Sequence, residues 1–143
     1  GQSIGKKSKI TQRTAHLADE NLSVIPVSLY KNAPTLESLD LSKNTLLDLP
    51  EDFFEMLRSL RILVLKNNCL YSIPPAIFQL QKLTHLNLSQ NHLDSAAIRH
   101  LAKLSNLTNL DLSSNQLDSL PETFTQLKNL VFWNFDLISE RNF

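Results

Sequence analysis

LESLDLSKNTL, residues 36–46, is the stretch that decides the fold. It follows the pattern L-x-x-L-x-L-x-x-N-x-L, and Leu39 and Leu41 would point to one side of a short strand because side chains alternate along a strand. The pattern recurs three times, and the starts of the four copies are 24, 23 and 24 residues apart. The later copies begin at Leu60, Leu83 and Leu107. A period of this length predicts a protein built from stacked repeats.

Two weaker copies flank the four clear ones. Ala15 and Leu17 lie one period, 24 residues, before the paired strand leucines of the first clear copy. After the last clear copy, Trp133 and Phe135 continue the strand pattern, and we expect both side chains to be buried because they occupy core positions. Imperfect copies at both ends are typical of a repeat stack, whose terminal units cap the core.

The repeat must stack to be stable. One short strand cannot bury its leucines, whereas stacked copies form a parallel sheet over a continuous core. Apolar–proline turns follow four of the strands, and the apolar residues after them predict short helical turns on the outer side. These prolines are Pro26, Pro50, Pro74 and Pro121. The sequence thus predicts an α/β solenoid, a horseshoe arc with parallel strands on its concave face and short helices and turns on its convex face.

The predicted domain organisation is simple. Residues 14–143 would form the repeat domain, after a basic N-terminal tail of residues 1–13 that carries four bases and no carboxylate. One asparagine recurs in each clear copy, three residues after the second strand leucine. A buried asparagine is costly unless it is hydrogen-bonded, so we expect these residues to form a structural ladder. The ladder comprises Asn44, Asn68, Asn91 and Asn115.

The copy that begins at Leu83 departs from the others after its asparagine. It has Ala96–Ala97 where the other copies have an apolar–proline pair. With no proline and good helix formers, Ser95 is expected to cap a regular helix over Ala96–Leu104. The alternative is a loop shortened by one residue.

The concave strand surface is the predicted binding face, since its exposed positions are free of the demands of the core. The predicted partner-contacting residues are His16, Ser38, Asp40, Ile62, Val64, His85, Asn87, Asn109, Asp111, Phe132 and Asn134. Ile62 and Val64 are apolar on a face that should meet water, and the polar residues around them complete the anatomy of a protein–protein patch. The alternative for this pair is β-propensity alone, because β-branched residues favour strands.

Composition excludes several functions. Formal net charge is zero, and the predicted face holds almost no lysine or arginine, which argues against nucleic acid. The single cysteine, Cys69, permits no internal disulfide, and no spacing of histidine, cysteine and carboxylate residues resembles a metal site. His85 could contact Asp111, but no activated nucleophile accompanies them. We therefore expect no enzyme activity, no cofactor, no metal and no small-molecule substrate.

The last copy offers a second candidate contact. LVFWNFDLISERNF, residues 130–143, concentrates aromatic residues at the open edge of the stack, where apolar area and unpaired backbone would be exposed. Residues 136–143 could fold back as a cap, the natural chain could continue, or a partner could cover the edge. The third case defines an alternative function, that of a structural subunit contacting a larger assembly through its aromatic C-terminal repeat.

Five specified positions recur in all four copies, and the pattern resembles the leucine-rich-repeat family over nearly the whole chain. Gly1 and Ser3, followed by TQRT at Thr11–Thr14, are similar to short intracellular leucine-rich-repeat proteins of the leucine-rich repeat-containing protein 57 type, which are generally longer. The resemblance implies an interaction protein and names no partner.

The first residues, GQSIGKKSK, fit an acylated start. Gly1 would accept myristate after removal of an initiator methionine, although Gly5 stands where the motif favours serine or threonine. Lys6, Lys7 and Lys9 would each add about 1 kcal/mol at an anionic membrane to the marginal affinity of one acyl chain. The alternative is a glycine left by removal of an expression tag, ahead of a solvated basic tail.

The leading hypothesis is a scaffold that binds a cytosolic protein through its concave face. No apolar run is long enough to span a bilayer, and no signal-peptide region follows the lysines. The expected location is therefore the cytoplasm, or the cytoplasmic face of an anionic membrane if Gly1 is acylated.

Acylation is tested by the mass of the N-terminal peptide after expression in eukaryotic cells supplied with myristate. We expect an increase of one myristoyl group, absent from Gly1→Ala, because the motif requires glycine at the acylated position. An unmodified wild-type peptide would contradict the tether and leave residues 1–9 as a solvated tail.

Overall fold

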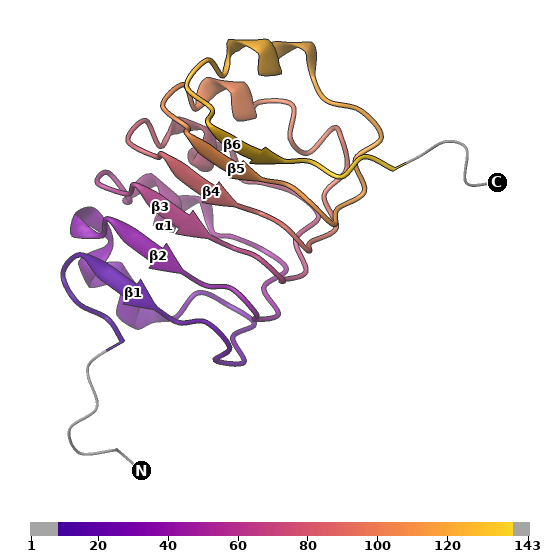
Figure 1. Cartoon of the computed structure of the whole chain (residues 1–143). Coiled ribbons are helices and arrows are strands. Elements are labelled where there is room, and N and C mark those ends of the chain that lie inside the picture. Colours follow the sequence, from indigo (N-terminus) through magenta and orange to yellow (C-terminus); the bar gives the residue numbers. More distant parts are fainter. Residues whose placement is uncertain (1–8, 139–143) are drawn as a thin grey trace.

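Six short strands form one parallel sheet, in chain order, in the computed structural model, which describes residues 9–138. Figure 1 shows the strands stacked along an arc, with the helical segments on the other side of the repeat stack. The strands are β1 (Thr14–His16), β2 (Ser38–Asp40), β3 (Ile62–Val64), β4 (His85–Asn87), β5 (Asn109–Asp111) and β6 (Phe132–Asn134). The predicted α/β solenoid, with strands on one face and short helices and turns on the other, is confirmed.

The register of the sheet follows the period of the sequence. Asp40 pairs with Val64, Val64 with Asn87, and Asn87 with Asp111, so equivalent residues of successive repeats are neighbours. Leu39 and Leu63, the middle residues of β2 and β3, are fully buried on the core side. Because side chains alternate along a strand, the residues on either side of each middle residue face out from the sheet.

The convex side consists of short helical segments. These are η1 (Val27–Thr35), α1 (Glu51–Glu55), η2 (Pro75–Gln79), η3 (Leu101–Lys103) and η4 (Glu122–Gln126). Four of them begin directly after Pro26, Pro50, Pro74 or Pro121, each in an extended conformation. Proline fixes φ near −65° and has no backbone N–H. It therefore leaves no unpaired donor where the extended segment meets the helical turn.

Aromatic packing fills the convex half of the first repeats. Phe53 and Phe54 of α1 are fully buried and meet edge to face, with ring centroids 5.2 Å apart. Tyr30 of η1 packs on Phe53 at 5.0 Å. Burial and a hydrogen-bonded negative neighbour, Asp52, raise the pKa of the Tyr30 hydroxyl. Burying one such side chain contributes about 1.5–3 kcal/mol, so the repeat depends on its convex half as well as on its strand.

The buried core runs continuously from Ala15 to Leu127 and stops there among the described residues. Trp133 is 57% exposed, and the expectation that it would be buried is wrong. Phe135 is half-buried against Phe124, with ring centroids 5.8 Å apart. Both residues occupy core positions of the register, but no further repeat within residues 9–138 lies over them.

Each ladder asparagine joins its own repeat to the one before it. The Asn68 amide donates to the carbonyl oxygens of Leu41 and Leu65 at 3.0 and 3.1 Å, and its Oδ1 accepts the Leu46 N–H at 3.0 Å. Asn44, Asn91 and Asn115 repeat this arrangement. Asn44, Asn68 and Asn91 are buried, and every buried side-chain polar atom in the described part of the chain has a partner.

The residue before each ladder asparagine has a left-handed backbone. Lys43, Asn67 and Gln90 have φ of 57°, 58° and 56°. This conformation costs a residue other than glycine about 1–2 kcal/mol. Its N–H nevertheless continues the sheet bonding, since the Lys43 N–H donates to Lys66 O at 2.9 Å. The ladder and the sheet bonds together offset the strain in a chain whose two glycines are Gly1 and Gly5.

The helix expected over Ala96–Leu104 is wrong. The segment forms turns, with 3₁₀ geometry over Leu101–Lys103, and its backbone bonds span three residues rather than four, as from Leu101 N to Ile98 O. Asp94, not Ser95, accepts the Ala97 N–H at 2.9 Å.

Ser95 instead forms hydrogen bonds with the following repeat. Its hydroxyl donates to Asp118 Oδ1 at 2.7 Å and accepts the backbone N–H groups of Asp118 and Ser119. Hydrogen bonds from Ser95 and Ser119 hold the pKa of the Asp118 carboxyl below its ordinary value. β4 and β5 start 24 residues apart, as β1 and β2 do, so the alternative of a loop shortened by one residue does not describe this repeat either.

The described part of the basic segment contacts the first repeat. Ile10 forms an antiparallel bridge with Ala15, and the His16 N–H donates to Lys9 O at 2.8 Å. The Lys9 ammonium forms an ion pair with Glu20, 2.6 Å between Nζ and Oε2. Residues 9–13 therefore pack beside β1 before the repeats begin.

The asparagine ladder predicts a large cost for Asn68→Ala. The substitution leaves the Leu46 N–H and two buried carbonyl oxygens without their partner, so the free energy of unfolding should fall by about 2–4 kcal/mol. Urea unfolding followed by circular dichroism measures it. The control is Asn106→Ala, which removes one bond from an exposed side chain and should cost less than about 1 kcal/mol. Equal losses for the two variants would contradict a structural ladder.

Candidate functional site

Two columns of outward-facing side chains cross the sheet. The first contains Ser38, Ile62, His85, Asn109 and Phe132, and the second contains His16, Asp40, Val64, Asn87, Asp111 and Asn134. All eleven predicted contact residues therefore lie on the concave face, each in register with its neighbour. Ile62 is 36% exposed and Phe132 is 51% exposed. Val64, which lies between Asp40 and Asn87 in the second column, is half-buried.

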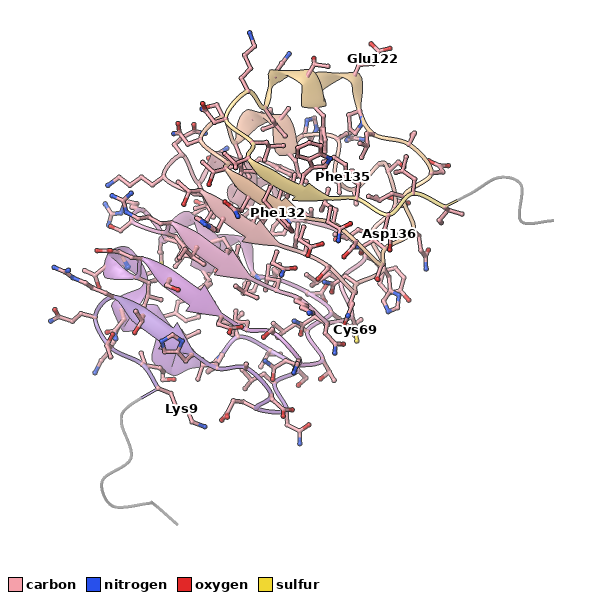
Figure 2. The ribbon with its side chains drawn as sticks, viewed as in Figure 1. Lys9, Cys69, Glu122, Phe132, Phe135 and Asp136 are labelled. Carbon is pink, nitrogen blue, oxygen red and sulfur yellow. The ribbon has the colours of Figure 1, made fainter. Side chains whose placement is uncertain are left out.

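An open hollow of about 230 Å³ occupies the middle of this face. Its outward-facing lining comes from four adjacent strands and consists of Ile62, Val64, His85, Asn87, Asn109, Asp111 and Phe132. His16, Ser38, Asp40 and Asn134 lie outside the lining, toward the two ends of the sheet. Phe132, labelled in Figure 2, adds an apolar side chain from the last strand, and His85 and Asn109 separate it from Ile62 in the first column.

Three polar members of the second column are held by serines two residues further on. Asp40 Oδ1 accepts the backbone N–H and the hydroxyl of Ser42 at 2.9 and 2.7 Å. Asn87 with Ser89, and Asp111 with Ser113, repeat the arrangement. Sequence reasoning missed these turns, although the shared spacing D/N-L-S could have revealed them because such side chains readily bond backbone two residues on. The turns fix the direction of each side chain.

The possible contact of His85 with Asp111 is not formed. His85 Nδ1 instead lies 2.9 Å from the Thr84 hydroxyl oxygen, and Asp111 Oδ1 is bonded to Ser113. Within residues 9–138, no three histidine, cysteine, aspartate or glutamate residues are grouped so that they could hold a metal ion. Cys69 is half-buried and unbridged.

The repeat pattern matches a known family model, described as Leucine rich repeat, in four overlapping stretches: residues 16–70, 34–93, 58–117 and 82–134. This chain belongs to the leucine-rich-repeat family. Domains of this family generally mediate protein–protein interactions. No curated protein is similar enough to this leucine-rich-repeat chain to count as a match.

Solved structures of leucine-rich-repeat domains share the fold. The APL1 leucine-rich-repeat domain superposes with a TM-score of 0.76 at 29% identity, over 87% of this chain and 33% of its own. The ectodomain of the Arabidopsis thaliana membrane receptor kinase GASSHO1/SCHENGEN3, solved in complex with Casparian strip integrity factor 2, has a TM-score of 0.69 at 35% identity, over 79% of this chain and 14% of its own. The ectodomain of the Arabidopsis thaliana receptor kinase SOBIR1 has a TM-score of 0.63 at 26% identity, over 83% of this chain and 66% of its own.

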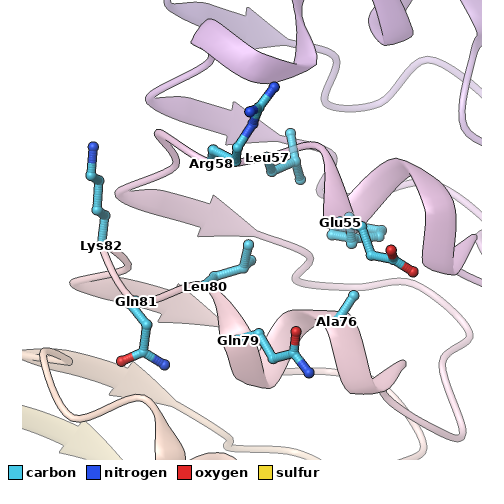
Figure 3. Close-up of a pocket in the computed structure, with 9 residues that line it drawn as sticks. Glu55, Leu57, Arg58, Ala76, Gln79, Leu80, Gln81 and Lys82 are labelled. Atoms are coloured by element: carbon cyan, nitrogen blue, oxygen red, sulfur yellow. The ribbon is translucent and has the colours of Figure 1, made fainter.

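A second hollow, of about 340 Å³, lies on the convex side between α1 and η2 (Figure 3). Its floor contains Leu57 and Leu80, which belong to the core of the repeats. Its rim carries both signs of charge, from Glu55, Arg58 and Lys82. Charged side chains of both signs are the ordinary content of a solvated protein surface.

The C-terminal edge is the other apolar surface. Val131, Phe132 and Trp133 are 80%, 51% and 57% exposed, and β6 has β5 as its one neighbour in the described sheet. Leu137 and Ile138 are also exposed. Residues 139–143, which include part of the predicted cap, lie outside the described residues.

The predicted lipid anchor falls largely outside the described residues. Gly1, Lys6 and Lys7 lie in the part of the chain that the structure does not describe. Lys9 is described, and its ammonium is paired with Glu20. No helix between residues 9 and 138 is both long and apolar enough to cross a membrane.

Proposed function

We propose that this leucine-rich-repeat chain is a non-catalytic scaffold that binds a cytosolic protein through its concave face. The observation that carries the proposal is the hollow of about 230 Å³ that Ile62 and Val64 line on one side. It has apolar side chains at its two ends, on β3 and on β6, and polar side chains of β4 and β5 between them, of which Asn87 and Asp111 are held by serines. Apolar side chains beside ordered polar ones are the usual components of a protein-binding surface.

The comparisons support a protein as the partner. The GASSHO1/SCHENGEN3 ectodomain, which has the same repeat fold, was solved in complex with Casparian strip integrity factor 2. By analogy, the concave face of this chain would contact a protein segment. Three polar side chains of this face are already held by serines, so less conformational entropy is lost on association.

A membrane tether forms the second part of the proposal. Myristate on Gly1 with Lys6 and Lys7 would hold the chain at the cytoplasmic face of an anionic membrane. Lys9 would contribute less than the other lysines, because Glu20 already neutralises its charge. Residues 9–13 lie beside β1, at one end of the arc (Figure 1). A tether at this end would leave the concave face of the other strands accessible.

The concave face is tested with the double variant Ile62→Glu, Val64→Glu. A protein captured by the wild-type chain from cytosol is purified and titrated against each variant by isothermal calorimetry. We expect the dissociation constant to rise at least about thirty-fold, since two carboxylates would have to be desolvated in the apolar centre. Leu47→Glu is the matched control, because Leu47 is 56% exposed and lies outside the concave strands. Unchanged binding by the double variant would refute the concave face.

We propose as a second candidate function a structural subunit that associates through its C-terminal edge, and exposed Trp133 and Val131 favour it. The occupant would be a second copy of this chain, whose β6 could pair antiparallel across a two-fold axis and place the two tryptophans together. The open strand edge and the adjoining apolar area would then be covered at once.

Sedimentation velocity over a concentration series tests this candidate. Wild type should form dimers, and Val131→Lys with Trp133→Lys should be monomeric because two charges would enter the apolar contact. Val27→Lys, at an 84% exposed residue on η1, is the control and should dimerise as wild type does. A wild-type chain that stays monomeric at all concentrations would exclude self-assembly through this edge.

A further inference from the structure

The charges of the concave strands have one sign. Asp40 on β2 and Asp111 on β5 are the acidic residues of the six described strands, which contain no lysine or arginine. Each carboxylate uses Oδ1 to accept two bonds from a serine. The second oxygen of each takes part in no hydrogen bond between residues 9 and 138, so both carboxylates are oriented and still able to accept a donor.

The two carboxylates bracket the apolar centre. Asp40 and Asp111 lie in one column with Val64 and Asn87 between them, so three strand spacings separate them. At about 4.8 Å per spacing, this distance is about 14 Å. An extended peptide rises about 3.3 Å per residue, and residues i and i+4 are therefore about 13 Å apart. Side chains of i, i+2 and i+4 also point to the same side of such a peptide.

The part of the hollow beside β3 and β4, which lies between the two carboxylates, can take the middle side chain. The volume of the whole hollow, about 230 Å³, exceeds the roughly 150 Å³ that holds a benzene molecule in a protein interior. Ile62 and Val64 supply its apolar wall on this side, and Phe132 stands at the other end of the hollow, on β6. A leucine-sized or phenylalanine-sized side chain at position i+2 would thus lie between basic side chains at i and i+4.

Lys66 bounds this surface where the chain leaves β3. It is half-buried and stands two residues after Val64, at the position that Ser42, Ser89 and Ser113 occupy in other repeats. Lys43 is exposed one residue after Ser42. A basic partner residue beside Lys66 and Lys43 would be repelled, whereas one beside Asp40 or Asp111 would be attracted. The charges therefore favour a peptide lying across the strands rather than along them.

We propose that the concave face recognises an extended peptide segment of the form basic–x–apolar–x–basic, lying across β2 to β5. The two basic side chains meet Asp40 and Asp111, and the apolar side chain enters the hollow. This inference rests on the proposed function, because it names the chemistry of the partner that the same face would bind.

The probe is a fluorescein-labelled peptide containing Lys-Ser-Leu-Ser-Lys, measured by fluorescence anisotropy on the full chain at low salt. Two peptides serve for comparison: the analogue with glutamate in place of both lysines, and the isomer Lys-Lys-Ser-Leu-Ser. The isomer has the same net charge but the wrong spacing. We expect the first peptide to bind tightest and to weaken as salt screens the two ion pairs.

Asp40→Asn and Asp111→Asn remove the charge while keeping the turn. Asn87 stands in the same column and bonds Ser89 as the aspartates bond their serines, so asparagine fits this position. Each variant should raise the dissociation constant of the basic peptide about two- to five-fold, the effect of losing one exposed ion pair. Lys66→Ser, which installs the residue of the neighbouring repeats, should lower this dissociation constant. Thermal unfolding of the variants checks that the fold is kept.

The outcomes separate this inference from the proposed function. If the two asparagine variants and Lys66→Ser leave peptide affinity unchanged, or if the glutamate analogue or the isomer binds as well, the basic–apolar–basic motif is refuted. The proposed function would still stand as long as the Ile62 and Val64 double variant loses its protein partner. If that double variant keeps its partner, the concave face itself is refuted and the motif with it.

Discussion

The hydrogen bonds of the asparagine ladder are the interaction on which the rest of the structure depends. Each amide bonds carbonyl groups that directly follow two successive strands and each Oδ1 accepts an N–H from the preceding repeat, as Asn68 does with Leu41, Leu65 and Leu46. A chain that leaves a parallel strand abruptly exposes backbone groups that the core cannot solvate. The ladder satisfies them, so a strand of three residues can end at once and the chain can cross to the convex side.

The functional surface is a consequence of that constraint. Because every repeat leaves its strand at the same point, the register passes unchanged from β1 to β6, and side chains of six repeats gather in two columns. Ile62 and Val64 lie next to His85 and Asn87 although 23 residues separate the pairs in the chain. Serines two residues after Asp40, Asn87 and Asp111 then fix the rim.

Period-based reasoning succeeded where one repeat resembles the next and failed where a repeat differs from its neighbours. The six strands, their order and the two columns follow from the spacing of the leucines. The helix expected over Ala96–Leu104 does not form, since Ser95 bonds Asp118 and Ser119 of the following repeat, a contact that local helix propensity does not include. Trp133 occupies a core position of the repeat but stays exposed, because no further repeat within residues 9–138 packs over it.

The sequence by itself determined the repeat, its period, the leucines of the core and the residues of the concave face. All of these depend on alternation along a strand and on a leucine spacing that recurs from copy to copy. Only the tertiary structure decided how the surface between repeats is shaped: the hollow beside Val64, the orientation of the Asp40 and Asp111 carboxylates, and the exposed edge at Trp133. These features arise from contacts between repeats, whose distances and directions are set when the repeats stack.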